Sequence, residues 1–238
     1  MESDSAFIQD CLSDSGNRFE FWMNFINRIE VRNLVEIGVY RGEFSEKILR
    51  SCDGIKKYYL LDPWRNLANW DKPANVDDST FKGYFDEAMR ATEFAIEKRV
   101  VLRGKTTEII DKIPDNSLDF SYIDGDHTLR GITIDLIKVF PKVRNGGYIG
   151  GDDFSRTIWQ HSPNFEPTLI FPYALYFAEA MSVRIYSLPY DQFLISKSEN
   201  GAFEFVDLAG NYSDPSLKNQ FLQMIQYVVS QIKQGKSG

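Results

Sequence analysis

The sequence lacks the features that membrane-embedded, disulfide-stabilised or nucleic-acid-binding proteins require. No apolar run approaches the roughly 18 residues of a membrane span, and the polar, acidic first five residues show no signal-peptide pattern. The two cysteines, Cys11 and Cys52, are too few for a disulfide framework. The formal net charge is -7 and basic residues form only short runs, which disfavours a nucleic-acid partner. We therefore expect a cytoplasmic protein that binds neither membrane nor nucleic acid.

The chain does contain enough apolar material for a sizeable core. Of its 238 residues, 43% are hydrophobic and 14% are aromatic, and the sequence shows no repeat or low-complexity block. This length suits one domain with appendages. We predict a single domain over residues 1–238, in which 1–30 form an N-terminal helical appendage, 31–198 the core that carries the chemistry, and 199–238 a C-terminal extension with a helix at 215–233.

Short apolar runs alternate with helical patterns through most of the chain. Candidate strands are 34–37, 57–61, 99–102, 118–123, 148–150, 183–188 and 192–196, and candidate helices are 43–51, 79–96, 106–112, 129–140 and 168–181. Alternating strands and helices imply right-handed crossovers and a parallel sheet. The short link at 189–191 can join only antiparallel neighbours. The predicted fold is a Rossmann-like, doubly wound α/β sheet, mostly parallel, with helices on both faces and a terminal antiparallel hairpin.

A glycine turn follows the first predicted strand. Glu36 stands near the end of the strand, and Gly38, Tyr40 and Gly42 lead into the next helix. A strand, a tight turn and a helix form the usual nucleotide-type site of α/β proteins. The spacing Glu-x-Gly-x-x-x-Gly differs from the dinucleotide pattern, which has Gly where Glu36 stands. It resembles the first motif of class I S-adenosylmethionine (SAM)-dependent methyltransferases, which implies that these four residues bind the cofactor; a chance glycine turn is the alternative.

The ends of the second and third predicted strands extend this interpretation. Asp62 ends the second strand, where an acid can accept hydrogen bonds from both ribose hydroxyls; alternatively it is a turn or capping acid before Pro63. Lys105 and Thr106 follow the third strand, where the methyltransferase resemblance implies contacts to the adenine. The alternative for Thr106 is a helix N-cap.

Three carboxylates end the fourth and fifth predicted strands: Asp124, Asp152 and Asp153. Neighbouring strands lie about 5 Å apart, and acids crowded this closely repel one another unless a cation compensates them. Oxygen ligands suit hard divalent ions such as Mg²⁺. The sequence therefore predicts a metal site on these three residues, with capping of the following segment as the alternative role for Asp152 and Asp153.

The segments Ile-Asp-Gly-Asp-His at 123–127 and Gly-Gly…Asp-Asp at 146–153 sharpen the resemblance. Together they resemble a bacterial family that includes metal-dependent sugar O-methyltransferases. The resemblance covers residues 34–196, and Asp153 departs from the Asn of the more distant catechol-type enzymes. It implies SAM as cofactor, with Asp124 also in its site, and Mg²⁺ on the three acids. It implies a small hydroxylated acceptor such as a sugar or glycosylated metabolite, and it leaves a homo-oligomer open.

Either His127 or Asp126 is expected to act as the general base. Histidine suits this role because its ordinary pKa near 6.5 matches neutral operation; a helix-capping His127 is the alternative. Three other functions stay open. They are metal-independent N- or carboxyl-methyl transfer, SAM or nucleotide binding without catalysis, and, less favoured, nicotinamide-dependent redox chemistry.

Overall fold

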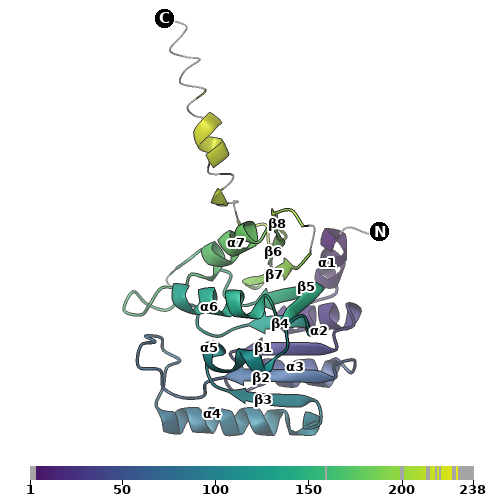
Figure 1. Cartoon of the computed structure of the whole chain (residues 1–238), viewed down its shortest axis with the longest axis vertical. Helices are drawn as coiled ribbons and strands as arrows, with labels where there is room; N and C mark the ends of the chain where they lie inside the picture. Colours follow the sequence, from purple (N-terminus) through teal and green to yellow (C-terminus); the bar gives the residue numbers. More distant parts are fainter. Residues whose placement is uncertain are drawn as a thin grey trace, which may run out of the picture.

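The computed structural model describes residues 4–158, 160–198, 201–212, 215–217, 219, 221–226 and 229. Its strands form one sheet in the order β3-β2-β1-β4-β5-β7-β6-β8, which Figure 1 shows stacked from β3 at the bottom to β8 at the top. The strands are β1 Asn33–Ile37, β2 Lys57–Asp62, β3 Arg99–Arg103, β4 Leu118–Ile123, β5 Val143–Gly151, β6 Arg184–Leu188, β7 Gln192–Ser196 and β8 Glu204–Asp207. No helix in the described part of the chain has the length and apolar character needed to cross a membrane.

The strand directions confirm the predicted fold class. Strands β1 to β5 are parallel, and β7 runs antiparallel to both β5 and β6. The central strands β1 and β4 are buried along most of their length because helices cover both faces of the sheet. Strand β8, which pairs in parallel with β6, was not predicted and comes from the C-terminal extension.

Helices form a layer on each face of the sheet. They are α1 Asp4–Ser13, α2 Arg18–Arg28, α3 Glu43–Ser51, α4 Asp78–Ala91, α5 Thr106–Ile109, α6 Leu129–Val139 and α7 Ile170–Ala180, with 3-10 turns at Glu93–Ala95 and Ile110–Lys112. One apolar cluster joins the sheet to α5, α6 and α7, and the other joins it to α1, α2, α3 and α4. In Figure 1 these groups lie on opposite sides of the strands, with α4 beside β3 at the bottom.

The helices differ most from the predicted ones in three places. The predicted helix at 79–96 is α4 followed by a 3-10 turn, and the predicted helix at 106–112 is the short α5 with its own 3-10 turn. Within the predicted tail helix, residues 221–226 are helical, whereas parts of the range 215–233 lie outside the described residues.

Side-chain caps fix the starts of two helices that matter for the site. The Asn17 carboxamide oxygen accepts hydrogen bonds from two backbone N–H groups at the start of α2. The Thr128 hydroxyl accepts one from Gly131 N at the start of α6. Such caps satisfy amides that have no partner inside the helix. They place Arg18 at the first position of α2, and they place His127 directly before Thr128, the cap of α6.

Candidate active site

The carboxyl ends of β1, β2, β4 and β5 meet at one edge of the sheet. Ile37 pairs with Leu61 on one side and with Ile123 on the other, and Ile123 pairs with Gly151. The residues that come directly after these four are Gly38, Asp62, Asp124 and Asp152. Backbone hydrogen bonds continue past the strand ends, from Asp124 N to Ile37 O at 2.8 Å and from Asp152 N to Ile123 O at 3.0 Å. The register thus brings the predicted site residues into one row.

The glycine turn is closely packed against the end of β4. Gly38 has φ +89°, and a Cβ atom there would lie 2.1 Å from the backbone oxygen of Asp124. Gly42 has φ +84° and precedes α3. Between them Tyr40 has φ 54°, an unusual value for a bulky residue, and the residue is 46% exposed. The turn therefore presents its backbone and the Tyr40 ring at the sheet edge.

Asp62 holds this turn in place. Its Oδ2 atom accepts hydrogen bonds from Val39 N at 2.9 Å and Tyr40 N at 3.0 Å, and its Oδ1 atom accepts one from Trp64 N at 2.7 Å. Trp64 Nε1 in turn donates to Tyr40 O at 2.8 Å. Burial raises the pKa of Asp62, and the three N–H donors oppose that rise. Each carboxylate oxygen has two acceptor positions, so Oδ1 retains one.

Glu36 lies beneath the turn and not at its surface. It is 2% exposed and accepts hydrogen bonds from the Ser45 hydroxyl of α3 and, at 2.7 Å, from the Tyr58 hydroxyl of β2. Burial raises the pKa of the Glu36 carboxyl to about 8, in spite of both hydrogen bonds. The described contacts of Glu36 therefore link β1 to α3 and β2.

The two predicted residues after β3 differ in environment. Thr106 is buried, and its hydroxyl donates to Asp135 Oδ1 of α6 at 2.6 Å. Burial raises the pKa of Asp135 to about 7, although this hydrogen bond lowers it. Lys105 is exposed, with its ammonium 3.5 Å from a Glu108 carboxylate oxygen. Thr106 thus faces the interior and Lys105 faces the surface.

Asp124, His127 and Asp153 form a compact acidic group that carries metal-ligating atoms. One such atom from each residue lies within 4.8 Å of the others. His127 Nδ1 contacts Asp153 Oδ2, and His127 Nε2 lies 3.3 Å from Asp124 Oδ1. The Nε2 atom is buried and makes no aligned hydrogen bond to any described residue. Burial lowers the pKa of His127, but the two carboxylates outweigh it and raise that pKa to about 10.

Asp152, the third predicted metal ligand, has other partners in the structure. Its carboxylate pairs with the Arg18 guanidinium and accepts a hydrogen bond from Gln192 Nε2 at 2.5 Å. Gln192 Oε1 is held by Trp22 Nε1 at 2.8 Å and by the Tyr122 hydroxyl at 2.9 Å. The structure therefore groups Asp124 and Asp153 with His127 and places Asp152 beside the N-terminal helix α2.

Asp126, the alternative base, is tied to the loop between β2 and α4. Its Oδ1 atom accepts hydrogen bonds from Trp70 Nε1 at 2.9 Å and from Thr128 N at 3.0 Å. The Arg130 guanidinium lies 4.0 Å from its second oxygen. Asp126 is thus fixed in position next to the acidic group.

Two loops, 63–77 and 154–169, contact each other near these acids. The Asp71 N–H donates to Glu166 Oε2 at 2.9 Å, and Lys72 Nζ donates to the Thr168 hydroxyl at 3.1 Å. Lys72 is 6% exposed, and burial lowers its pKa while nearby carboxylates, Glu166 among them, oppose that change. Gln160 Nε2 reaches Asp153 Oδ1 at 2.6 Å. The loops therefore connect directly to the acidic group.

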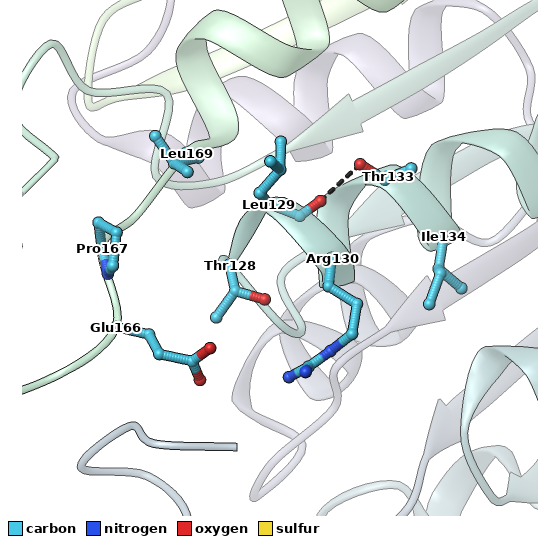
Figure 2. A pocket seen from close by; sticks show the side chains of 8 residues that line it. All are labelled: Thr128, Leu129, Arg130, Thr133, Ile134, Glu166, Pro167 and Leu169. Carbon is cyan, nitrogen blue, oxygen red and sulfur yellow. Dashed lines mark hydrogen bonds between the residues drawn. The ribbon is translucent and has the colours of Figure 1, made fainter. Parts of the chain in front are cut away.

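A cavity of about 430 Å³ lies between the start of α6 and the second of these loops (Figure 2). Its lining consists of Thr128, Leu129, Arg130, Thr133, Ile134, Glu166, Pro167 and Leu169. In Figure 2 the Glu166 and Arg130 side chains lie to the left and right of Thr128, and both extend below it in the view. None of the predicted catalytic or cofactor residues lines this cavity. The cavity therefore lies next to the candidate site and is not a part of it.

Four residues of the site were not predicted: Arg18, Lys72, Gln160 and Gln192. Arg18 lies 134 positions before Asp152 in the chain, in a segment with no recognisable motif. Gln192 begins β7, where the pattern indicates only a strand. The one available signal is the length and polarity of the loops that carry Lys72 and Gln160, because long loops at this edge of an α/β sheet are often functional.

The chain is similar in sequence to a known protein family and to a viral protein. A family model described as a methyltransferase domain matches residues 35–154, just over half of the 238 residues. Uncharacterized protein R132 of Acanthamoeba polyphaga mimivirus is 26% identical over 153 residues, which are 63% of this chain. The match spans 64% of that curated relative's length.

Solved structures with similar folds include three methyltransferases. An O-methyltransferase from Bacillus cereus in complex with SAH has TM-score 0.55 and 18% identity, covering 83% of this chain and 93% of that one. TomG from Streptomyces achromogenes, in complex with SAM, has TM-score 0.53 and 13% identity over 83% and 91%. SAH-bound PaMTH1 from Podospora anserina has TM-score 0.52 and 14% identity over 79% and 81%. At these identities the similarity shows a shared fold.

Proposed function

The chain belongs to the family of methyltransferase domains, and from this we propose that it transfers the methyl group of SAM to a hydroxyl oxygen of a small acceptor, with the help of a divalent cation. The observation that carries the proposal is the row of residues at the sheet edge. The glycine turn and Asp62 stand on one side of β4, and Asp152 and Asp153 stand on the other. A cofactor held by the first group would face an acceptor held by the second.

The glycine turn and its neighbours are suited to the cofactor. We assign the amino acid end of SAM to the turn from Gly38 through Tyr40 to Gly42, because this turn joins a buried strand to a helix at the carboxyl edge of the sheet. The free acceptor position on Asp62 Oδ1 suits a ribose hydroxyl. We retain Lys105, Thr106 and Asp124 as further cofactor contacts. Glu36 would act from below, through Ser45 and Tyr58.

The acidic group fits a divalent cation by two observations. It gathers carboxylate and imidazole atoms within 4.8 Å, and it contains the buried Nε2 atom of His127, which has no aligned partner among the described residues. We propose that Asp124 and Asp153 of this group hold the ion together with Asp152, which is adjacent to Asp153 in the chain and pairs with Arg18 in the structure. Oxygen ligands favour Mg²⁺. When bound, the ion would stabilise negative charge on the acceptor oxygen.

The chain's own residues would then orient the acceptor and take its proton. SAM supplies a methyl group that its sulfonium already activates, so catalysis depends on positioning and on proton removal. His127 and Asp126 are the two candidates for the base. His127 lies between two carboxylates that outweigh burial and raise its pKa to about 10, so it would serve as a base only where a bound cation offsets their charge. Asp126 is fixed by Trp70 and Thr128. The contacts between the two loops would limit the access of water to this space.

The test measures cofactor binding and turnover separately. SAM binding is followed by calorimetry, and turnover by release of S-adenosylhomocysteine in the presence of sugars and other polyhydroxylated acceptors. We expect turnover to require Mg²⁺, to stop with EDTA, and to fall strongly in Asp152→Ala and Asp153→Ala variants that still bind SAM. Turnover that survives chelation in these variants would contradict the role of the cation and favour metal-independent N- or carboxyl-methylation. SAM binding without turnover across the acceptors would favour a non-catalytic binding protein.

A further inference from the structure

Arg18 reaches the proposed cation site from outside the predicted catalytic core. It is the first residue of α2, and the cap by Asn17 fixes where that helix starts. Its guanidinium pairs with the Asp152 carboxylate, and the two side chains are 32% and 11% exposed. Because the carboxylate is largely withdrawn from water, this pair is not one of the freely solvated pairs that contribute little.

The same helix also contacts Gln192, the second side-chain partner of Asp152. Trp22 lies one helical turn after Arg18 and is fully buried. Its indole N–H donates to Gln192 Oε1, and Gln192 Nε2 donates to Asp152 Oδ1. Helix α2 thus holds Asp152 twice, directly through Arg18 and indirectly through Trp22 and Gln192.

The pairing with Asp152 brings the charge of Arg18 to the row of acids at the sheet edge. Asp152 and Asp153 are adjacent in the chain, and Asp124 and Asp152 directly follow Ile123 and Gly151, which pair across β4 and β5. In the structure, therefore, a guanidinium supplies part of the positive charge that a divalent ion would supply to the same carboxylates.

We propose that Arg18 is an internal competitor for the divalent cation: it holds Asp152 when no ion is bound and releases Asp152 when the ion binds. This inference rests on the proposed function, because it concerns the same three acids. Under this proposal α2 is a part of the site, because binding of the ion breaks the contact between Arg18, in the first turn of α2, and Asp152 at the sheet edge. Arg18 is in this sense a positioning residue, which acts through Asp152.

The expected change in ion affinity on removal of Arg18 follows from the fraction of molecules in which Asp152 is not paired with Arg18. The apparent dissociation constant of a ligand equals the intrinsic constant divided by the competent fraction. If Arg18 occupies Asp152 about nine tenths of the time, removal of the guanidinium tightens ion binding about tenfold. A merely structural role for Arg18 predicts the opposite sign, because a loosened site would bind the ion more weakly.

The experiment titrates Mn²⁺ into the full chain without SAM and measures its dissociation constant by calorimetry. Four proteins are compared: wild type, Arg18→Gln, Arg18→Lys and Arg28→Gln. Arg28 is the matched control, because it ends α2 and pairs with Asp10 and Asp14, so its loss changes the net charge equally without touching the acids. We expect about tenfold tighter binding in Arg18→Gln, and affinities close to wild type in the other two variants.

A second measurement uses the wild type alone and does not depend on any variant folding. Hydrogen exchange of the amides at 18–22 is compared with and without Mn²⁺. We expect faster exchange in the loaded protein, because the first turn of α2 loses its ion pair. Unchanged exchange at these amides in a protein that binds Mn²⁺ would overturn the proposal.

The outcomes separate this inference from the proposed function. Equal or weaker Mn²⁺ binding in Arg18→Gln than in wild type overturns the competition and leaves the metal role standing. No Mn²⁺ binding by any of the four proteins, with SAM binding intact, overturns both the competition and the metal role. If Arg18→Gln is the only one of the four proteins with measurable Mn²⁺ binding, the competition is supported, and Arg18 then occupies Asp152 in nearly all wild-type molecules.

Discussion

Replacing Asp62 by Asn separates the two tasks that the structure gives this side chain. The carboxylate accepts three backbone N–H bonds, two on Oδ2 and one on Oδ1. An Asn can keep its oxygen towards Val39 and Tyr40, but its NH₂ group then faces the Trp64 N–H. The variant therefore leaves one buried donor unpaired, which costs about 1–3 kcal/mol of stability. It also removes the free acceptor position that we assign to the ribose, and loss of a charged hydrogen bond corresponds to roughly tenfold or more in affinity.

Asp119→Asn is a closely matched control at the opposite end of β4. One oxygen of Asp119 accepts from Arg32 N at 2.9 Å and Asn33 N at 2.8 Å, and the other accepts from Arg144 Nε at 2.7 Å. This substitution should cost similar stability in urea unfolding and leave SAM affinity unchanged in calorimetry. If Asp62→Asn loses the same stability but binds SAM as tightly as wild type, Asp62 supports the turn only and the ribose assignment is refuted.

Three further variants test other parts of the structure. Burial holds the folded-state pKa of Glu36 at about 8, against 4.5 when unfolded, so its stabilising effect is full below pH 4.5 and is lost as the pH rises to about 8. The free energy of unfolding of the wild type should decline over this pH range with a slope of at most about 1.4 kcal/mol per pH unit, and Glu36→Gln should lack this decline in unfolding titrations. If the free energies of unfolding of the two proteins change in parallel with pH, the raised pKa of Glu36 is contradicted. Gly38→Ala places a methyl group 2.1 Å from a backbone oxygen and should cost at least about 2 kcal/mol and abolish SAM binding; Gly83→Ala, with nothing within 4 Å, should be neutral or stabilising. Lys72→Met should speed hydrogen exchange at 160–168 because it removes the Lys72–Thr168 hydrogen bond, one of the bonds between the two loops; unchanged exchange there would show that the loops do not depend on this bond.

The architecture was predictable because it depends on patterns that are local in the sequence. Buried parallel strands read as short apolar runs, and the three-residue link at 189–191 allowed only a hairpin. Once the strands are parallel neighbours, their carboxyl ends must lie at one edge. The proximity of Gly38, Asp62 and Asp124 then follows from sheet geometry alone. Strand β8 was missed because it lies at the sheet edge and its residues are only partly buried, so its apolar signal is weak.

The partners of individual side chains were less predictable, because they come from distant segments. The Arg18–Asp152 pair and the Gln192 bridge join residues 134 and 40 positions apart, and neither has a local pattern. The sequence indicated that Asp124, Asp152 and Asp153 follow the strands. It did not indicate which of these acids is contacted by a basic side chain of the same chain. That choice depends on where α2 packs across the sheet, which is set by the burial of aromatic residues such as Trp22.

The orientation of Glu36 shows what strand periodicity adds to a motif. Side chains alternate between the two faces of a strand. In β1, Val35 and Ile37 belong to the apolar cluster under α5 to α7, whereas Leu34 belongs to the cluster under α1 to α4. Position 36 has the parity of Leu34, so its side chain must point towards α3, where Ser45 receives it. A carboxyl group at that depth favours its protonated form, because a charge there would be costly without a cationic partner. The motif Glu-x-Gly thus joins a buried side chain that links β1 to α3 and β2 with a glycine packed against Asp124 at the sheet edge. Substitutions at the two positions should therefore disturb different properties: the pH dependence of stability for Glu36, and the geometry of the proposed cofactor site for Gly38.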